Sequence, residues 1–242
     1  MVELKIEGSI GYIEFSHPKA NALDKKNLEE LYKGFDQLNK NNQVHIIVLS
    51  SKKEEKKNVF SSGAFLDELK QAKDQEELSE LFFNFARLML EMIRSTKLII
   101  GIVIGKAIGG ALGLIASCDY VFSHRKTRFK LSELSFGIGP LVIEPVLSYK
   151  IGRSNFMKIA LHPKKEYKTS WAYQIGLIHK IAKRKNIQQE AITFAKELCG
   201  YSSRACSEIK KANWSHIDPL LEDLLQKRSF INAHLWAYKN LN

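Results

Sequence analysis

Hydrophobic and polar residues follow two different periods along the first part of the chain. Apolar residues alternate with polar ones over 2–6 and 11–15, on either side of Gly8-Ser9, which predicts a β-hairpin with an edge strand at the N-terminus. Helical spacing begins after Asp24, a suitable N-cap residue, and continues to Leu38. A longer amphipathic helix is predicted over Glu76–Arg94.

Short, continuous apolar runs predict buried strands at Val44–Ser50 and Leu98–Ile104. The second run leads into the glycine-rich segment Gly105–Asp119, which predicts a turn followed by a buried helix over Gly109–Ser117. The first N–H groups of a helix have no partner within it and favour developing negative charge. An enolate oxygen would fit such a place.

The second half of the chain is mainly helical. The polar stretch Ser51–Asn58 predicts a solvated loop, and Tyr120–Ser123 and Arg128–Lys130 predict short extended pieces. Further helices are predicted over Pro145–Ile151, Asn155–Leu161, Ser170–Ile175, Asn186–Cys199 and Ser203–His216, and after Asp218. Strands that alternate with helices, followed by helices alone, predict an α/β core over 1–185 and a helical C-terminal module over 186–242.

The composition is that of a soluble globular protein, because 45% of the 242 residues are hydrophobic and 26% are charged. No apolar run reaches about 18 residues, so no membrane span is expected. The N-terminal residues lack the apolar core of a signal peptide. Three cysteines form an odd count without metal-like spacing, which predicts free thiols, a reducing cytoplasmic location and no metal site.

The formal net charge of +11 raises the question of a polyanionic partner. The lysines occur in scattered groups that are not interleaved with aromatic residues, and there is no Cys/His finger, so a nucleic-acid partner is not expected. Most of these lysines are typical of a solvated surface. A phosphate-bearing substrate would benefit from the same positive field.

Four separated segments resemble motifs of the crotonase superfamily, which contains the enoyl-CoA hydratases and isomerases. Residues 17–23 (HPKANAL) are similar to its P-x-x-x-N-A-L motif, with one residue fewer, and residues 59–64 (VFSSGA) are similar to F-x-A-G-A-D. Residues 105–119 resemble N-G-x-x-x-G-G-G-x-x-L-x-x-x-C-D, and residues 129–140 resemble F-x-x-P-E-x-x-x-G-x-x-P. The order of the motifs holds from Ile10 to roughly Ile181.

The resemblance implies a spiral of ββα turns followed by helices that form a homotrimer or a dimer of trimers. It also implies an acyl-CoA thioester substrate with no metal or other cofactor. The oxyanion hole would consist of the backbone N–H groups of Ser62 and Gly110, and Lys19 would lie beside the CoA phosphates. The matched motifs place five further residues in the substrate site, namely Ala20, Ser61, Ala64, Gly109 and Gly113.

Two departures from the family pattern affect the expected chemistry. Hydratases of the family place two glutamates over the acyl Cα–Cβ bond; the first position holds Gly113 here, and the second holds Glu133. Phe65 replaces the aspartate that follows A-G-A in the family and removes a possible support of that loop. A possible second acid is Glu144, which lies in an apolar setting that would raise its pKa if it were buried.

A single carboxylate suits proton transfer within one molecule better than addition of water. One base that reaches both C2 and C4 can convert a 3-enoyl thioester into a 2-enoyl thioester. The retained Glu133 and the substituted Gly113 therefore favour an isomerase. Hydration or decarboxylation within the family remains open, as does a catalytically silent subunit that binds CoA thioesters.

Overall fold

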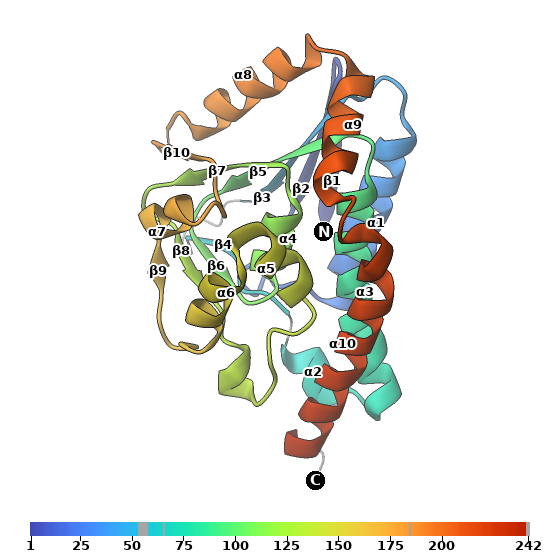
Figure 1. Ribbon diagram of the computed structural model, residues 1–242, viewed down its shortest axis with the longest axis vertical. Helices are drawn as coiled ribbons and strands as arrows, with labels where there is room; N and C mark the ends of the chain where they lie inside the picture. The colour runs from blue at the N-terminus through green and yellow to red at the C-terminus, as the bar shows by residue number, and fades with distance from the viewer. Residues whose placement is uncertain (53–57, 65, 184, 241–242) are drawn as a thin grey trace.

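The computed structural model describes residues 1–52, 58–64, 66–183 and 185–240 and contains two β-sheets surrounded by helices (Figure 1). The strands are β1 (Val2–Glu7), β2 (Ile10–Phe15), β3 (Ile46–Ser51), β4 (Val59–Ser61), β5 (Leu98–Val103), β6 (Lys106–Ile108), β7 (Tyr120–His124), β8 (Arg128–Lys130), β9 (Tyr167–Lys168) and β10 (Lys180–Ala182). The helices are α1 (Lys25–Lys40), α2 (Leu66–Gln71), α3 (Gln75–Arg94), α4 (Ala111–Ser117), α5 (Glu144–Ile151), α6 (Arg153–Ala160), α7 (Thr169–Gln174), α8 (Ile187–Cys199), α9 (Ser203–Trp214) and α10 (Asp218–Asn240), with a 3₁₀ helix η1 at Glu133–Phe136.

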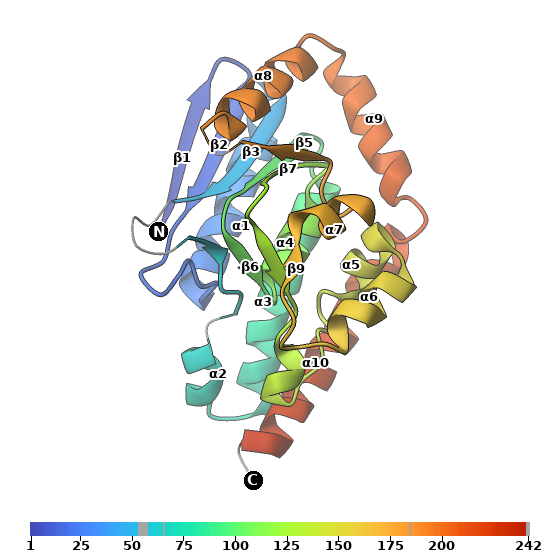
Figure 2. The same ribbon diagram turned by 90° about the vertical axis from the view of Figure 1, so that its left-hand side faces the viewer.

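The larger sheet has the strand order β1-β2-β3-β5-β7-β10 and is covered on both faces. Side chains of β3 alternate between two hydrophobic clusters: Ile47 and Leu49 face the main core, while Ile46 and Val48 face the cluster that includes Ile187 of α8. Figure 2 shows α8 lying across this sheet. Burial on both faces explains why the inner strands are continuous apolar runs. The predicted hairpin is confirmed, because β1 pairs with β2 in an antiparallel arrangement and stands at the edge of the sheet.

The smaller sheet has the order β4-β6-β8-β9, and its first three strands are parallel. These strands are only three residues long, so β4 and β6 leave no periodic signal in the sequence. Because parallel strands end at the same edge of a sheet, the segments after β4, β6 and β8 lie side by side. Ligands of α/β proteins commonly bind at such an edge.

The long helix α3 lies at the centre of the helical layer and packs against α1, α4 and α10. The C-terminal helix α10 runs along α3 (Figure 1), and Trp236 Nε1 donates a hydrogen bond of 2.9 Å to the carbonyl of Leu69 in α2. At the other end of α10, Arg94 of α3 forms ion pairs with Asp218 and Glu222 at 2.8 Å each. The last helix of the chain therefore covers the core of its own subunit.

Most predicted helices are confirmed to within a few residues, and the exceptions have local causes. The helix expected from Gly109 begins at Ala111, because Gly109 has φ +57°, which a right-handed helix does not allow. The helices α2 and η1 were not predicted, since each is too short to show a period. In the expected loop 51–58, Ser51 ends β3 and residues 53–57 lie outside the described part of the chain.

Candidate active site

Two glycine-containing loops meet at the carboxyl ends of β4 and β6. Gly63 has φ +82°, and a Cβ atom there would lie 2.5 Å from the carbonyl oxygen of Ile108 and 3.1 Å from the backbone nitrogen of Gly110. Only glycine allows both this backbone conformation and this close approach. The two loops are therefore held against each other by backbone atoms, with Ala64 and Gly110 lining one cavity.

The loop of residues 17–23 supports this arrangement from outside. Asn21 is fully buried, and its amide nitrogen donates to the carbonyl groups of Lys52 and Val59. Ala20 and Asn21 both have positive φ values, of 55° and 52°, which turn the chain toward β4. The N–H of Leu23 then donates to the carbonyl of Gly63 at 2.8 Å. The buried asparagine thus connects three segments that are distant in the sequence.

The backbone donors of the site differ from the expectation at one position. The N–H of Ser62 donates to the carbonyl of Ala20 at 3.0 Å, so it is already used within the loop and does not face a ligand. Among the described residues, neither the N–H of Ala64 nor that of Gly110 donates to a protein acceptor. The assignment of Ser62 as an oxyanion donor is therefore corrected: the pair of available donors is Ala64 and Gly110.

Glu133 follows β8 and begins η1, which places its side chain beside the glycine loop. A Cβ atom at Gly109 would lie 3.1 Å from Glu133 Oε1, so the absence of a side chain at Gly109 leaves room for the carboxylate. The residue is partly exposed, but Oε2 is buried and has no hydrogen-bond partner among the described residues. Burial raises the pKa of Glu133 to about 7, while the backbone N–H groups of Glu133 and Ser132 act in the opposite direction.

The cavity next to Glu133 is mainly apolar. Its walls come from α1, α2, α3, the start of α4, the loop after η1 and α10. The apolar lining residues are Leu23, Leu28, Leu69, Leu81, Phe82, Phe85, Ile138, Val142 and Ile143. A mainly apolar cavity that holds the Glu133 carboxylate and two free backbone N–H groups, with Lys25 and Glu68 as its other charged lining residues, is typical of a binding site for a small ligand.

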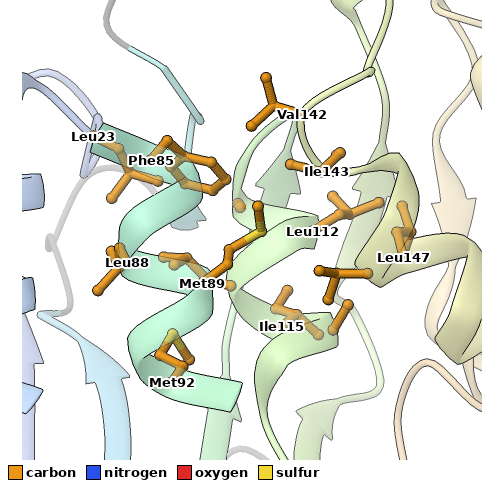
Figure 3. Close-up of a cluster of buried hydrophobic side chains, with 14 of the residues drawn as sticks. Leu23, Phe85, Leu88, Met89, Met92, Leu112, Ile115, Val142, Ile143 and Leu147 are labelled. Carbon is orange, nitrogen blue, oxygen red and sulfur yellow. The ribbon is translucent and has the colours of Figure 1, made fainter. Parts of the chain in front are cut away.

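The position that would hold a second glutamate is filled by apolar side chains. A Cβ atom at Gly113 would lie 2.7 Å from Ile143 Cγ2, 2.9 Å from Met89 Sδ and 3.1 Å from Phe85 Cε1. Figure 3 shows Phe85 and Met89 of α3 packed toward Ile143 and the first turns of α4. Gly113 is buried and does not line the cavity, which corrects its expected role in substrate binding.

Glu144 is not brought together with Glu133. Its Oε1 accepts a hydrogen bond of 3.1 Å from Ser148 Oγ, and its Oε2 lies 3.5 Å from a guanidinium nitrogen of Arg228 in α10. The side chain lines a different cavity, between α5 and α10. Glu144 therefore connects these two helices, and the structure does not support it as a second acid of the site.

The remaining predicted residues have different positions. Lys19 is exposed, is not among the residues that line the cavity, and its Nζ lies 2.7 Å from Asp67 Oδ2 of α2. Ser61 is buried, and its Oγ accepts the N–H of Gly63, so its role is to hold the loop. The N–H of Gly109 donates to the carbonyl of Lys130 at 2.9 Å. Phe65, expected to alter the loop, lies outside the described residues.

Three polar residues of the cavity, Lys25, Glu68 and Asn232, were missed by sequence analysis. Glu68 of α2 lines the cavity; its Oε2 accepts the N–H of Lys25 at 2.9 Å, and burial raises the pKa of its carboxyl. Asn232 of α10 also lines the cavity and is 3% exposed. None of the three belongs to a recognisable motif, so only the tertiary arrangement of α1, α2 and α10 around the cavity reveals them.

The described residues contain no cluster of three or more His, Cys, Asp or Glu side chains arranged to hold a metal ion. Within the same part of the chain, no helix combines the length and the apolar character needed to cross a bilayer. The fold and the site thus define an α/β protein with a paired N–H donor site and a buried carboxylate at the edge of its smaller sheet.

Comparison with known proteins identifies the family. The sequence profile of the enoyl-CoA hydratase/isomerase family matches residues 5–237, and the chain belongs to this family. The protein is 28% identical over 173 residues to the bacillaene synthase dehydratase PksH of Bacillus subtilis, covering 67% of this chain and 62% of that protein. It is 24% identical over 213 residues to the short-chain-enoyl-CoA hydratase of Clostridium acetobutylicum, covering 87% and 80%, respectively.

Solved structures confirm the fold. A crystal structure of an enoyl-CoA hydratase from Bacillus halodurans superimposes with a TM-score of 0.91 at 24% identity, covering 99% of this chain and 96% of that chain. The α/β crotonase fold with C-terminal helices is therefore confirmed. A further relative is the mitochondrial enoyl-CoA hydratase domain-containing protein 3 of zebrafish, which is 27% identical over 197 residues, or 80% of this chain. The chain spans 62% of the length of PksH and 65% of the length of this zebrafish protein.

Proposed function

We propose that this protein is an acyl-CoA isomerase that moves a double bond from the 3-position to the 2-position of an enoyl thioester. Glu133 would act as the single acid and base, and the N–H groups of Ala64 and Gly110 would hold the thioester oxygen. The observation that carries this proposal is the position of Glu133, a buried carboxylate beside the glycine loop that also presents Gly110.

The proposed reaction moves one proton and one double bond. The Glu133 carboxylate removes a proton from C2, and the electron pair shifts onto the thioester oxygen, where the two N–H groups stabilise the enolate. The protonated Glu133 then returns the proton to C4, which leaves the double bond between C2 and C3. A pKa of about 7 suits both steps, because the group is neither too weak a base nor too weak an acid near neutral pH.

The packing around Gly113 supports a one-carboxylate mechanism. Hydration needs a water molecule that is positioned and deprotonated while another proton reaches Cα, a task for which the family's hydratases use two glutamates. Here the first of these positions has neither a carboxylate nor free space, because Ile143 and Met89 occupy it. An apolar wall at this place also disfavours a positioned water molecule, which needs polar partners.

Turnover of matched thioesters tests the proposal. Purified protein is incubated with 3-enoyl-, 2-enoyl- and malonyl-type CoA thioesters, and the products are separated by liquid chromatography and mass spectrometry. We expect isomerisation without addition of water, and a loss of about 10²–10⁴-fold for Glu133→Gln. Glu144→Gln, the same change outside the cavity, should retain wild-type turnover. An unchanged rate for Glu133→Gln would show that the assignment of the base is wrong.

Enoyl-CoA hydration is a second candidate function, favoured by Glu68. This carboxylate lines the same cavity as Glu133, and burial raises its pKa, so it could supply the second acid that position 113 lacks. If hydration occurs, Glu68→Gln should abolish it, whereas Glu80→Gln on the exposed face of α3 should not. Loss of carbon dioxide from the malonyl thioester would instead identify a decarboxylase. Binding of thioesters without any reaction would identify a catalytically silent subunit.

Cofactor, assembly and location are further parts of the proposal. The isomerisation transfers only a proton, so it requires no metal ion or redox cofactor.

We propose a homotrimer or a dimer of trimers, supported by exposed apolar residues on the C-terminal helices, namely Ile209, Leu220, Phe230, Ile231, Leu235 and Tyr238. Light scattering coupled to size-exclusion chromatography tests this, since a monomer would contradict it. Localisation of a tagged chain tests the proposed cytoplasmic site.

A further inference from the structure

Asn232 is a buried polar residue whose side chain is not accounted for by the fold. It is 3% exposed, lines the cavity beside Glu133, and its Oδ1 is buried without a hydrogen-bond partner among the described residues. A buried acceptor without a partner is unfavourable, and such groups are normally satisfied by protein, water or ligand. The side chain therefore has an unused capacity for hydrogen bonding inside an apolar cavity.

The position of Asn232 is fixed by contacts on both sides along α10. One turn later, Trp236 is anchored to α2 through its hydrogen bond to Leu69. One turn earlier, Arg228 forms its ion pair with Glu144 of α5. Because these contacts hold α10 in place, the amide of Asn232 cannot turn toward solvent without displacing the helix. A single polar group is thus presented from a rigid element.

Asn232 and the proposed thioester donors come from different parts of the cavity wall. Gly110 stands at the start of α4, which packs against α3 and α5, whereas Asn232 comes from α10, on another wall of the helical layer. The remaining lining residues contributed by α3 are the apolar Leu81, Phe82 and Phe85. A ligand that holds its thioester at Gly110 and fills the cavity would extend its acyl chain along the wall that includes Asn232.

We infer that Asn232 is a specificity-determining residue that binds a hydroxyl group carried by the acyl chain of the substrate. This inference rests on the proposed acyl-CoA function. A hydroxyl group both donates and accepts, so it fits an amide whichever of its two polar atoms faces the ligand. A site built to hydrogen-bond a hydroxyl group rejects the analogue that lacks it, because its own polar group then stays unpaired. Plain hydrocarbon chains are therefore the poorer ligands.

Binding of unreactive thioesters tests the inference independently of turnover. Saturated acyl-CoA thioesters of increasing chain length, each with and without a terminal hydroxyl group, are titrated into the full-length protein by calorimetry. We expect that at one chain length the hydroxyacyl thioester binds on the order of tenfold more tightly than its hydrocarbon partner. Asn232→Leu should abolish this preference, because it should weaken binding of the hydroxyacyl thioester and strengthen binding of the hydrocarbon one.

Control variants separate recognition from structure. Gln226→Leu makes a similar change on the exposed face of α10 and should keep the preference. The melting temperature of Asn232→Leu should equal or exceed that of the wild type, because an unpartnered amide is replaced by an apolar group; a structural asparagine would give a lower value. If Asn232→Leu does not fold, Asn232→Ala removes the amide without adding volume.

The outcomes are distinguishable. If the two thioesters of every pair bind with equal affinity, the inference is overturned and the proposed acyl-CoA site is left intact. This result is expected if only water hydrogen-bonds to the Asn232 amide. A preference that survives in Asn232→Leu or Asn232→Ala would also overturn it. Failure of every thioester to bind would refute the proposed acyl-CoA site together with the inference.

Discussion

Replacement of Glu133 by glutamine should stabilise the protein at neutral and alkaline pH. Burial raises the pKa of Glu133 from 4.5 to about 7, so the folded protein holds this proton more tightly than the unfolded chain. The stability associated with the group is fully present below pH 4.5 and is lost as the pH rises through about 7. The interval of about 2.5 pH units corresponds to about 3 kcal/mol.

Because glutamine does not titrate, the variant avoids this loss. Near pH 4 the two proteins should have similar free energies of unfolding, and above about pH 7 the variant should be more stable by up to about 3 kcal/mol. For a chain of this size that difference corresponds to about 6–12 °C in melting temperature. Urea unfolding followed by circular dichroism from about pH 4 to about pH 8 measures it.

The same titration should govern activity. The proposed reaction requires the Glu133 carboxylate, so kcat/KM for a 3-enoyl-CoA should fall as the pH drops below about 7. Glu144→Gln is the matched control for stability, because it changes a glutamate that is hydrogen-bonded to Ser148 and paired with Arg228. If wild type and Glu133→Gln lose stability in parallel over the whole pH range, the carboxylate is not desolvated and the reasoning is wrong.

Three further predictions concern the site and its support. Gly113→Glu should lower the free energy of unfolding by about 3 kcal/mol or more, because even a Cβ atom there would lie 2.9 Å from Met89 Sδ. It should also produce no hydratase activity. Urea unfolding and a hydration assay test both expectations, and new hydration in a stable variant would contradict them. Gly110→Pro removes one N–H donor at a φ of −50° that proline accepts, so kcat should fall about 10²–10³-fold, and an unchanged kcat would exclude this donor. Circular dichroism checks that the variant folds, because a Cβ atom there would lie 3.3 Å from Phe85 Cζ. Lys210→Met should lower the free energy of unfolding by about 3–5 kcal/mol, because it leaves Asp119 without its buried partner. Lys211→Met on the exposed side of α9 should lower it by less than about 1 kcal/mol. Similar losses for the two variants in denaturant unfolding would show that the buried pair has no special role.

Local pattern was sufficient for most of the secondary structure. The N-terminal hairpin, α1, α3 and the helices after residue 143 follow from apolar periodicity, because each of them buries one face or both faces of a regular element. The strands β4 and β6 and the helices α2 and η1 were not predicted, since they are shorter than the windows in which a period is visible. Two of these short pieces carry polar residues of the site, because η1 begins at Glu133 and α2 contains Glu68.

The two available backbone donors show why sequence position alone was insufficient. Ser62 and Ala64 flank Gly63, and the motif does not indicate which N–H faces the cavity. Which N–H faces the cavity depends on the loop that contains Ala20, because the carbonyl of Ala20 accepts a hydrogen bond from the N–H of Ser62. That loop precedes β4 by some forty residues of sequence, so a local pattern contains no information about the contact.

The sequence by itself determined the family, the order of the motifs, the retained Glu133 and the missing glutamate at Gly113, because these depend only on residue types and their spacing. The tertiary structure decided which N–H groups remain free, that apolar side chains fill the space at Gly113, and that Glu68 and Asn232 reach the cavity. The physical reason is that hydrogen-bond saturation and packing arise from contacts between α2, α3, α4 and α10, which lie far apart in the chain.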